Sequence, residues 1–317
     1  MCTAITLPTA RGALFGRTLD LDAHFGERVA LTPRRFDFDF RLTDAPRKGA
    51  HRPLLGMAAV ADGYPLYADA MNDAGLCIAG LRFAGYARYD SHTEDGRAGS
   101  ICLAPWELIP FILAYHRTVD EAEAALGQVR LVDHPFSVDL PNTPLHWMIA
   151  DRSGASLVVE ATDTGVQIYR NPVGVLTNAP PFPCQLSHWQ SYARMTAVHP
   201  ADTVGQGTHP LGAGAEGLPG DYTSPSRFVR AAFLRREAGR LAEDVPDPVS
   251  QFFSVLGAVA PPFGAVLTPD GKPHRTLYTS CADTAEGRYY YKTESSRWLR
   301  WVSFVDRGEA VEGDRVV

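Results

Sequence analysis

Cys2 is the residue whose type and position most directly suggest chemistry, because it follows Met1 at the start of the sequence. A thiolate is a strong nucleophile, but a free thiol has a pKa of about 8.5 and needs a base or a positive neighbour at neutral pH. If Met1 is removed, which a small second residue permits, the α-amino group of Cys2, with a reference pKa of about 7.7–8.0, can serve as that base. The sequence therefore predicts a nucleophile at Cys2, provided that other residues complete a site.

The remaining cysteines and the histidines do not form a metal-binding pattern. The chain has five cysteines, an odd number, and no C-x-x-C pair, which disfavours a disulfide framework and a zinc ribbon. We expect the other four to be packing residues: Cys77, Cys102, Cys184 and Cys281. The ten histidines include no H-E-x-x-H motif, so metal hydrolysis is disfavoured, and no other motif indicates a cofactor. A papain-like pairing of the thiol with His146 or His188 is an alternative that no local motif supports.

The composition indicates a folded protein. Of its 317 residues, 45% are hydrophobic and 21% are charged, which is ordinary for a globular chain. The formal net charge of −6 argues against nucleic acid as the main partner. No stretch reaches the ~18 apolar residues of a membrane span, and the first residues do not resemble a sorting signal. We therefore expect no membrane partner, a cytoplasmic location and, without a convincing linker, a single domain over residues 1–317.

Strands and helices are predicted in separate blocks. The predicted strands are 3–7, 13–21, 28–32, 55–61, 66–71, 76–83, 145–150, 156–161, 166–169, 173–177, 276–282, 288–293 and 298–304. The predicted helices are 105–116, 119–129, one with Ser224 as N-cap and Pro225 as first residue, and one that follows Asp247-Pro248 toward Val259. This order favours antiparallel sheets covered by helices over alternating βαβ units. The glycine-rich segment 204–221 is expected to form one long surface loop.

Ten short motifs, in a fixed order over nearly the whole chain, resemble those of one family. They are Met1–Ile5, Phe15–Asp20, Thr32–Arg34, Asn72–Leu76, Ala79–Leu81, Leu145–Trp147, Val175–Asn178, Gly217–Asp221, Ser224–Phe228 and Arg275–Ser280. Together they closely resemble the choloylglycine hydrolase family, which includes bile salt hydrolases and penicillin V acylases. The resemblance implies an α+β N-terminal nucleophile hydrolase, built as a four-layer αββα sandwich whose first strand presents the catalytic cysteine.

The resemblance also implies roles for five catalytic residues. Cys2 matches the nucleophile, and Arg17 matches the arginine whose charge stabilises the thiolate. Asp20 matches the aspartate that orients the free amine, Asn178 matches the asparagine that donates into the oxyanion hole, and Arg227 completes the polar network. Each residue alone has a simpler explanation: Arg17 could form a surface ion pair with Asp20, and Asn178 could end a strand. Their joint occurrence with Cys2 favours the site.

Arg82 departs from the family pattern. Bile salt hydrolases typically have asparagine at this position, and related penicillin acylases often have tyrosine. The resemblance implies that the backbone N–H of residue 82 is the second oxyanion donor, a role that does not depend on the side chain. The Arg82 side chain could pair with an anionic group of the ligand or with a loop carboxylate, and the sequence does not favour either.

Three loops correspond to segments that shape the substrate pocket in this family, namely 22–27, 61–65 and 132–143. Each contains an aromatic residue that could form part of an apolar wall for a hydrophobic acyl group. These candidate substrate-binding residues are Phe25, Tyr64 and Phe136.

The sequence leaves two classes of function open. The first is a cysteine-dependent hydrolase of linear non-peptide amides, which acts through a thioester and releases a small amine from a bulky apolar acid. Its small-molecule substrate could be a conjugated bile salt, penicillin V or an acyl-homoserine lactone. The second is a small-molecule-binding protein on the same scaffold, in which Met1 is retained or Arg82 blocks the pocket. Homo-oligomers, often tetramers, are usual in the family, and segment 204–221 corresponds to its assembly loop.

Overall fold

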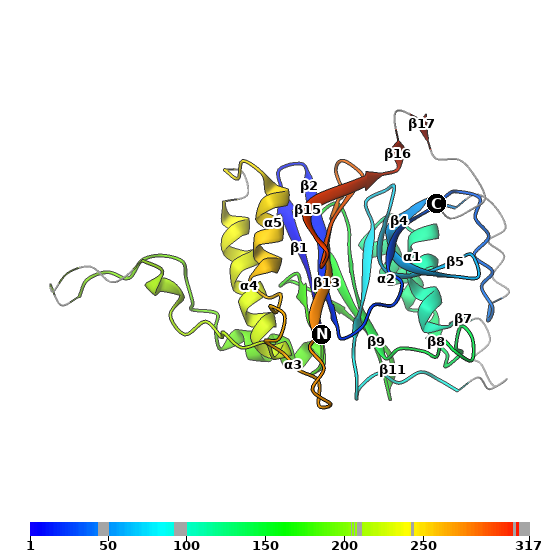
Figure 1. Ribbon diagram of the computed structural model, residues 1–317, viewed down its shortest axis with the longest axis horizontal. Helices are drawn as coiled ribbons and strands as arrows, with labels where there is room; N and C mark the ends of the chain where they lie inside the picture. The colour runs from blue at the N-terminus through cyan, green and yellow to red at the C-terminus, as the bar shows by residue number, and fades with distance from the viewer. Residues whose placement is uncertain are drawn as a thin grey trace.

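Two large antiparallel sheets, here named sheet A and sheet B, form the centre of the protein (Figure 1). The computed structural model describes residues 1–43, 51–91, 100–203, 205, 207, 211–241, 244–306 and 309–310. Sheet A has the order β12-β1-β2-β13-β14-β15, with β1 Cys2–Thr9, β2 Gly12–Leu21, β12 Val175–Leu176, β13 Arg275–Asp283, β14 Arg288–Thr293 and β15 Ser296–Ser303. Sheet B has the order β11-β10-β9-β6-β5-β4-β3, with β3 Arg28–Thr32, β4 Leu54–Ala61, β5 Tyr64–Asn72, β6 Cys77–Arg82, β9 Leu145–Ala150, β10 Ser156–Thr162 and β11 Gly165–Arg170.

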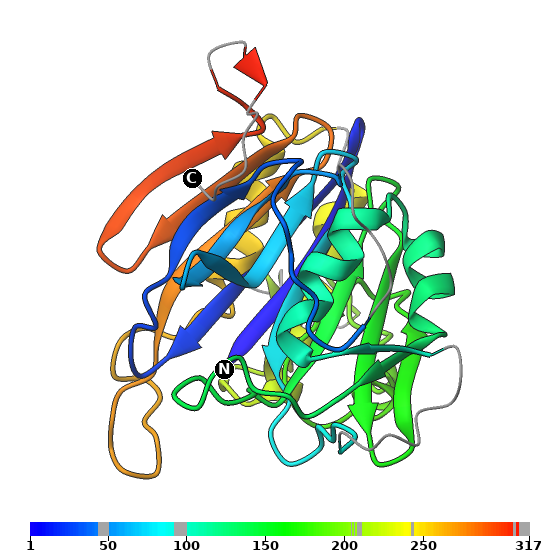
Figure 2. The ribbon, with the colours of Figure 1, turned by 90° about the vertical axis from the view of Figure 1, so that its right-hand side faces the viewer.

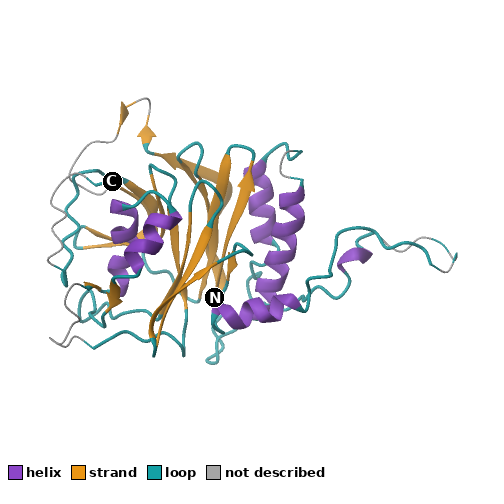
Figure 3. Ribbon diagram, turned by 180° about the vertical axis from the view of Figure 1, so that it is seen from behind, coloured by secondary structure: helices purple, strands orange, loops and turns teal. Residues whose placement is uncertain are grey.

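Helices cover the outer face of each sheet, as Figures 1 and 3 show. They are α1 Leu108–Tyr115, α2 Val119–Leu126, α3 Phe182–Gln190, α4 Ser224–Arg240 and α5 Pro248–Gly257, with 3-10 turns at Pro105–Glu107 and Ala213–Ala215. Helices α4 and α5 contact sheet A, whereas α1 and α2 contact sheet B, in front of which they lie in Figure 2. Two small sheets pair β7 Ile101–Leu103 with β8 Val129–Leu131, and β16 Val305–Asp306 with β17 Glu309–Ala310. The predicted four-layer αββα sandwich is confirmed.

The alternation of side chains along β9 explains how the layers pack. Trp147 and Ile149 belong to the core between sheet B and helices α1 and α2. Met148 and Ala150 belong to the core that sheet B shares with sheet A. Because successive strand residues point to opposite faces, a strand covered on both sides is apolar throughout. This is why the strands of sheet B have nearly continuous apolar sequences.

Several elements differ from the sequence prediction, and two of them, α3 and β12, bear on the site. Helix α3 was not expected because Pro181 and Pro183 suggest a break, although Pro181 is the N-cap and Pro183 lies in the first turn, where proline is tolerated. The strand expected at 173–177 is only Val175–Leu176, since the Asn171 side chain accepts hydrogen bonds from two backbone N–H groups just before it. Both differences lie beside the candidate site.

The segment between α3 and α4 extends away from the sheets (Figure 1). It contains the predicted surface loop 204–221, of which residues 204, 206 and 208–210 lie outside the described residues. Over the described part of the chain, none of the helices has both the length and the apolar character required to cross a membrane.

Candidate active site

The Cys2 thiol lies at the beginning of β1, in the interior of sheet A. β1 pairs with β2 on one side, where Cys2 is opposite Leu19, and with β12 on the other. The Cys2 side chain is buried, with 4% of the residue exposed. A strand held on both sides keeps this thiol in a fixed position, which a nucleophile requires.

Arg17 lies on the neighbouring strand β2 and is the cation whose charge acts most strongly on the Cys2 thiol. It is 1% exposed. Its Nη1 donates to the backbone carbonyls of Gly80 and Ala68, and its Nε donates to the carbonyl of Thr18. Its Nη2 is buried and has no hydrogen-bond partner among the described residues. The guanidinium is therefore fixed by backbone groups of both sheets, and one of its nitrogens remains available.

The electrostatics of the site favour a thiolate. Burial raises the pKa of Cys2, but Arg17, the amino terminus and a hydrogen bond from the Arg82 backbone N–H outweigh it, so the pKa of this thiol lies below its usual value. Burial also opposes the charge of Arg17, yet Cys2, Tyr278 and Asp69 raise its pKa overall. Each charge thus stabilises the other.

Asn178 and Arg227 bring distant parts of the chain to Cys2. The Asn178 Oδ1 accepts the Cys2 backbone N–H at 2.9 Å and the Arg227 Nη2–H at 2.7 Å. Arg227, buried on α4, also donates from Nη1 to the Cys2 carbonyl at 2.5 Å and to Thr3 Oγ1 at 2.7 Å. Because Oδ1 accepts two N–H groups, Nδ2 must be the opposite end of the amide, and it donates to the Arg82 carbonyl at 2.8 Å.

Asp20 lies beside the amino terminus, but its carboxylate has other partners. Its oxygens accept hydrogen bonds from Thr276 at 2.6 Å and Thr18 at 3.4 Å. The Met1 amine donates instead to the Asp20 backbone carbonyl at 2.6 Å, while burial lowers the pKa of this amine. In the chain that retains Met1, the contact of Asp20 with the terminal amine is therefore made by the backbone.

A cavity of about 560 Å³ opens beside Cys2 and Arg17. Phe25 and Phe136 line it, but Tyr64 does not. The Tyr64 ring packs behind the wall, 5.3 Å from the ring centre of Trp106 and 5.6 Å from that of Phe136. Tyr64 therefore supports the cavity wall from behind, whereas Trp106, which the sequence analysis did not single out, lines the cavity directly.

The three predicted pocket loops contribute unequally. Segment 132–143 supplies Phe136 and the run from Leu140 to Thr143, and segment 22–27 supplies Phe25. Segment 61–65 supplies none of the lining, which instead includes Ala59 and Leu66 on the two strands that it joins. The remaining lining residues are mainly apolar and come from both sheets, from the 3-10 turn Pro105–Glu107 and from the start of α1.

A second layer of polar residues, which the sequence analysis missed, holds Asn178. Gln185 on α3 donates from Nε2 to the carbonyls of Asn178 at 2.5 Å and Pro180 at 3.0 Å, and accepts from Thr177 Oγ1 at 2.7 Å. Ser224 was expected to cap α4, but the N-cap is Thr223. The Ser224 Oγ instead accepts the Asn178 backbone N–H at 2.9 Å. The available signal was a glutamine seven positions after Asn178. Without a predicted helix at α3, its burial and its contact with Asn178 could not be inferred.

The histidines of the papain-like alternative do not pair with Cys2. His146 is fully buried, and its ring nitrogens contact Glu160 at 3.2 Å and the Thr177 carbonyl at 3.0 Å. His188 is exposed on α3 and contacts the Tyr192 ring. Neither lines the cavity that contains the thiol.

Two of the four other cysteines are packing residues as predicted. Cys77 and Cys281 are buried, whereas Cys102 is half-buried and Cys184 is exposed on α3. The prediction was wrong for Cys184, because it lies on the outer side of a helix that was not anticipated. Within the described ranges, no three metal-ligating side chains form a cluster.

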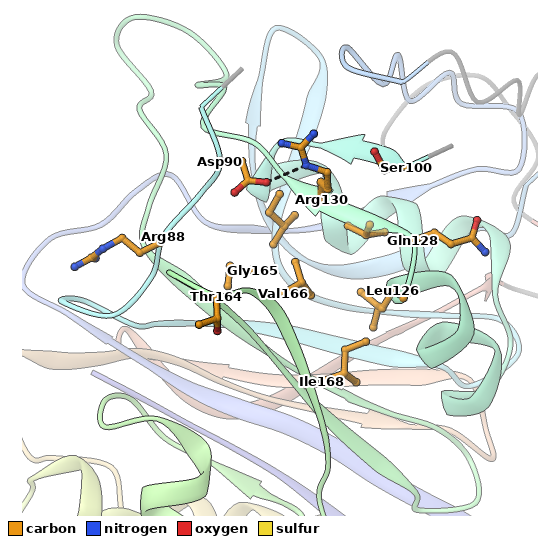
Figure 4. Close-up of a pocket in the computed structure, with 14 residues that line it drawn as sticks. Arg88, Asp90, Ser100, Leu126, Gln128, Arg130, Thr164, Gly165, Val166 and Ile168 are labelled. Carbon is orange, nitrogen blue, oxygen red and sulfur yellow. Dashed lines mark hydrogen bonds and ion pairs between the residues drawn. The ribbon is translucent and has the colours of Figure 1, made fainter. Parts of the chain in front are cut away.

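A larger cavity, of about 650 Å³, lies elsewhere, along β8 and β11 (Figure 4). Its lining includes Arg88 and an ion pair between Arg130 Nε and Asp90 Oδ2 at 2.9 Å. None of the residues described around Cys2 lines it. We therefore place the candidate active site in the smaller cavity, where the thiol is.

Known proteins resemble this chain over nearly its whole length. Residues 2–308 match the model of linear amide C–N hydrolases, choloylglycine hydrolase family. The bile salt hydrolase/transferase of Lactiplantibacillus plantarum is 40% identical over 307 residues, which cover 96% of this chain and 92% of that protein.

Solved structures have the same fold. The C2A mutant of the conjugated bile acid hydrolase from Clostridium perfringens matches with a TM-score of 0.89 and 33% identity, over 100% of this chain and 96% of that one. The penicillin V acylase from Agrobacterium tumefaciens, at 22% identity, matches in fold with a TM-score of 0.77 over 99% and 90% of the two chains. The resemblance inferred from the sequence motifs is confirmed: this chain belongs to the choloylglycine hydrolase family and is a linear amide C–N hydrolase.

Proposed function

We propose that this enzyme hydrolyses conjugated bile salts, with Cys2 as an N-terminal nucleophile. The observation that carries the proposal is the buried thiol, with its pKa lowered beside Arg17, at a cavity of mainly apolar lining. Such a cavity fits a bulky apolar acid, and the relatives named above act on bile salts or conjugated bile acids by their names. The non-catalytic alternative is not retained, because the chain belongs to a family of hydrolases.

The proposed reaction begins when Met1 is removed and the α-amino group of Cys2 becomes free. The thiolate adds to the amide carbonyl carbon, and the resulting oxyanion accepts the Arg82 backbone N–H and the second N–H of Asn178, whose first N–H is bonded to Arg82. The α-ammonium group then gives a proton to the departing nitrogen, the C–N bond breaks and a thioester remains.

Water completes the reaction. The α-amino group takes a proton from the water as it adds to the thioester, and collapse of the second tetrahedral intermediate releases the acid and the thiolate. Arg227 keeps Asn178 in place through Oδ1, and we propose that the Asp20 carboxylate orients the amine once Met1 has gone. No metal or cofactor takes part in these steps.

The proposal is tested with purified protein and glycocholate. Intact mass should show the loss of Met1, and Cys2→Ala should lower turnover by about 10³-fold or more while the melting temperature is kept. Cys184→Ala is the matched control because that cysteine is exposed on α3, and its turnover should equal that of the wild type. Equal turnover in Cys2→Ala, or full activity in protein that retains Met1, would overturn the mechanism.

The substrate is identified by comparing kcat/KM for three candidate amides. Glycocholate should have a higher kcat/KM than penicillin V or a long-chain acyl-homoserine lactone. A higher kcat/KM for penicillin V or for the acyl-homoserine lactone would mean that this compound, and not a bile salt, is the preferred substrate. The cytoplasmic location, the homo-oligomer and the single domain that the sequence suggests remain predictions.

A further inference from the structure

Apart from Cys2 itself, the charged residues that line the cavity are all of one sign. Within the described part of the chain, the lining contains two charged residues, Arg17 and Arg82, and no carboxylate. The rest of the lining is mainly apolar, with residues such as Phe136, Trp106 and Leu66. A cavity of this kind fits a molecule that is apolar over most of its length and carries a negative charge near one end.

The two arginines differ in how far their charges are already engaged. Arg17 is buried and donates three hydrogen bonds to backbone carbonyls. Arg82 is exposed, and its guanidinium makes no hydrogen bond or ion pair with any residue that the structure describes. The loop carboxylate considered as a partner from the sequence is therefore not found among those residues. The charge of Arg82 remains available to a ligand.

The backbone of Arg82 is tied to the reacting centre on both sides. Its N–H helps to lower the pKa of the Cys2 thiol, and its carbonyl accepts the Asn178 Nδ2–H at 2.8 Å. Arg82 is the last residue of β6 and pairs with Leu145 of β9. The Arg82 guanidinium is therefore carried by a backbone position that lies next to the proposed nucleophile.

Burial indicates which end of a substrate Arg82 faces. The apolar lining residues Trp147, Ile109 and Phe136 are buried, at 0%, 2% and 7% exposed. Cys2 and Arg82 line the same cavity, and Arg82 is the exposed charged residue of that lining. A substrate that places its apolar acid against the buried wall and its carbonyl at the thiol therefore directs its amine portion toward Arg82.

We propose that the Arg82 side chain is a specificity determinant that binds an anionic group on the leaving amine. The enzyme then prefers amides whose amine carries a carboxylate or sulfonate close to the nitrogen, as glycine and taurine do, over amides of a neutral amine. Asparagine, which is usual here in bile salt hydrolases, can only donate a neutral hydrogen bond to such an anion. This inference rests on the proposed function and names the part of the substrate that Arg82 recognises.

The test compares two substrates that differ only in this charge: glycocholate and its primary amide, cholylglycinamide. In the wild type, kcat/KM should be about 10-fold or more higher for glycocholate, mainly through a lower KM, because a charge-assisted pair is lost with the neutral amide. In Arg82→Gln, which keeps a polar side chain, the ratio of the two kcat/KM values should fall to about one. Arg82→Lys should restore part of the preference.

Arg88→Gln is the matched control, because Arg88 is an exposed arginine six positions further along that lines the other cavity. Its ratio should equal that of the wild type. A wild-type ratio of about one, or a ratio that Arg82→Gln leaves unchanged, would overturn the role of Arg82 while hydrolysis of both substrates upheld the proposed function. Hydrolysis of neither substrate would instead overturn the proposed function, and this inference with it.

Discussion

The side-chain oxygen of Asn178 accepts the backbone N–H of Cys2 at 2.9 Å, although the two residues are 176 positions apart. The same oxygen accepts a hydrogen bond from Arg227, which reaches it from α4. With Oδ1 fixed in this way, the amide nitrogen faces the Arg82 carbonyl. The proposed oxyanion donor is thus oriented before any substrate arrives, which is the condition for electrostatic catalysis.

Replacing Asn178 by alanine should remove one of the two proposed oxyanion donors. We expect kcat to fall by about 10²–10³-fold with a much smaller change in KM, because the donor acts mainly on the transition state. Steady-state kinetics with glycocholate measure both constants. Asn178→Asp is the companion variant, since it keeps the acceptor for Cys2 and Arg227 but loses the donor, and it should be equally impaired. If Asn178→Asp turned over at the wild-type rate, donation from this side chain would not be part of the mechanism.

Gln185→Leu should disturb the same donor from behind. The substitution leaves the half-buried carbonyls of Asn178 and Pro180 without their N–H donor, at a cost of up to about 1–3 kcal/mol each. We expect a lower melting temperature and a kcat reduced by about 10-fold, with KM little changed, because a displaced Asn178 no longer aims at the oxyanion. Gln190→Leu, at an exposed position on the same helix, should change neither value. A variant that was less stable but had the wild-type kcat would limit Gln185 to a structural role.

Arg17→Gln should shift the pH dependence of thiol reactivity. Because Arg17 lowers the pKa of Cys2, its removal should raise that pKa. Only the thiolate reacts with iodoacetamide, so the alkylation rate of the processed enzyme should rise with pH through the thiol pKa, and the curve of the variant should lie at higher pH. Arg34→Gln serves as the control because Arg34 pairs with Asp73, away from the cavity. Superimposable curves for wild type and Arg17→Gln would show that the thiolate is stabilised by other groups.

Gly16→Ala should destabilise the sheet that carries the site. A Cβ at Gly16 would lie 2.0 Å from the backbone oxygen of Ser280 on β13, so β2 and β13 would have to separate next to Arg17. We expect a loss of about 3 kcal/mol or more in the free energy of unfolding, measured by urea denaturation. Gly239→Ala is the control, because its Cβ would meet no atom within 4 Å on α4, and alanine should leave stability unchanged or raise it by up to about 1 kcal/mol. An unchanged midpoint in Gly16→Ala would mean that the two strands can adjust without cost.

Local signals were sufficient for most of the secondary structure. The strands at 28–32, 145–150 and 288–293 have the predicted bounds, because alternation and turn residues are properties of short stretches. Helix α3 was missed since its prolines suggest a break when the sequence is considered alone. Tyr64 was placed in the pocket wall because its loop matches a pocket segment, but its ring is covered by Trp106, and only packing decides which of two adjacent aromatic rings faces a cavity.

The sequence by itself determined the family, the four-layer fold and the candidate nucleophile. A thiol beside a potential terminal amine and a set of motifs in a fixed order can both be recognised from the sequence without the structure. Only the tertiary structure decided how Cys2, Arg17, Asn178 and Arg227 meet and that Gln185 and Ser224 hold Asn178. It also decided that Arg82 lies at an apolar cavity with no charge partner among the residues that the structure describes. The physical reason is that hydrogen bonds, burial and charge pairing depend on distances between residues far apart in the chain, which sheet register and helix packing set.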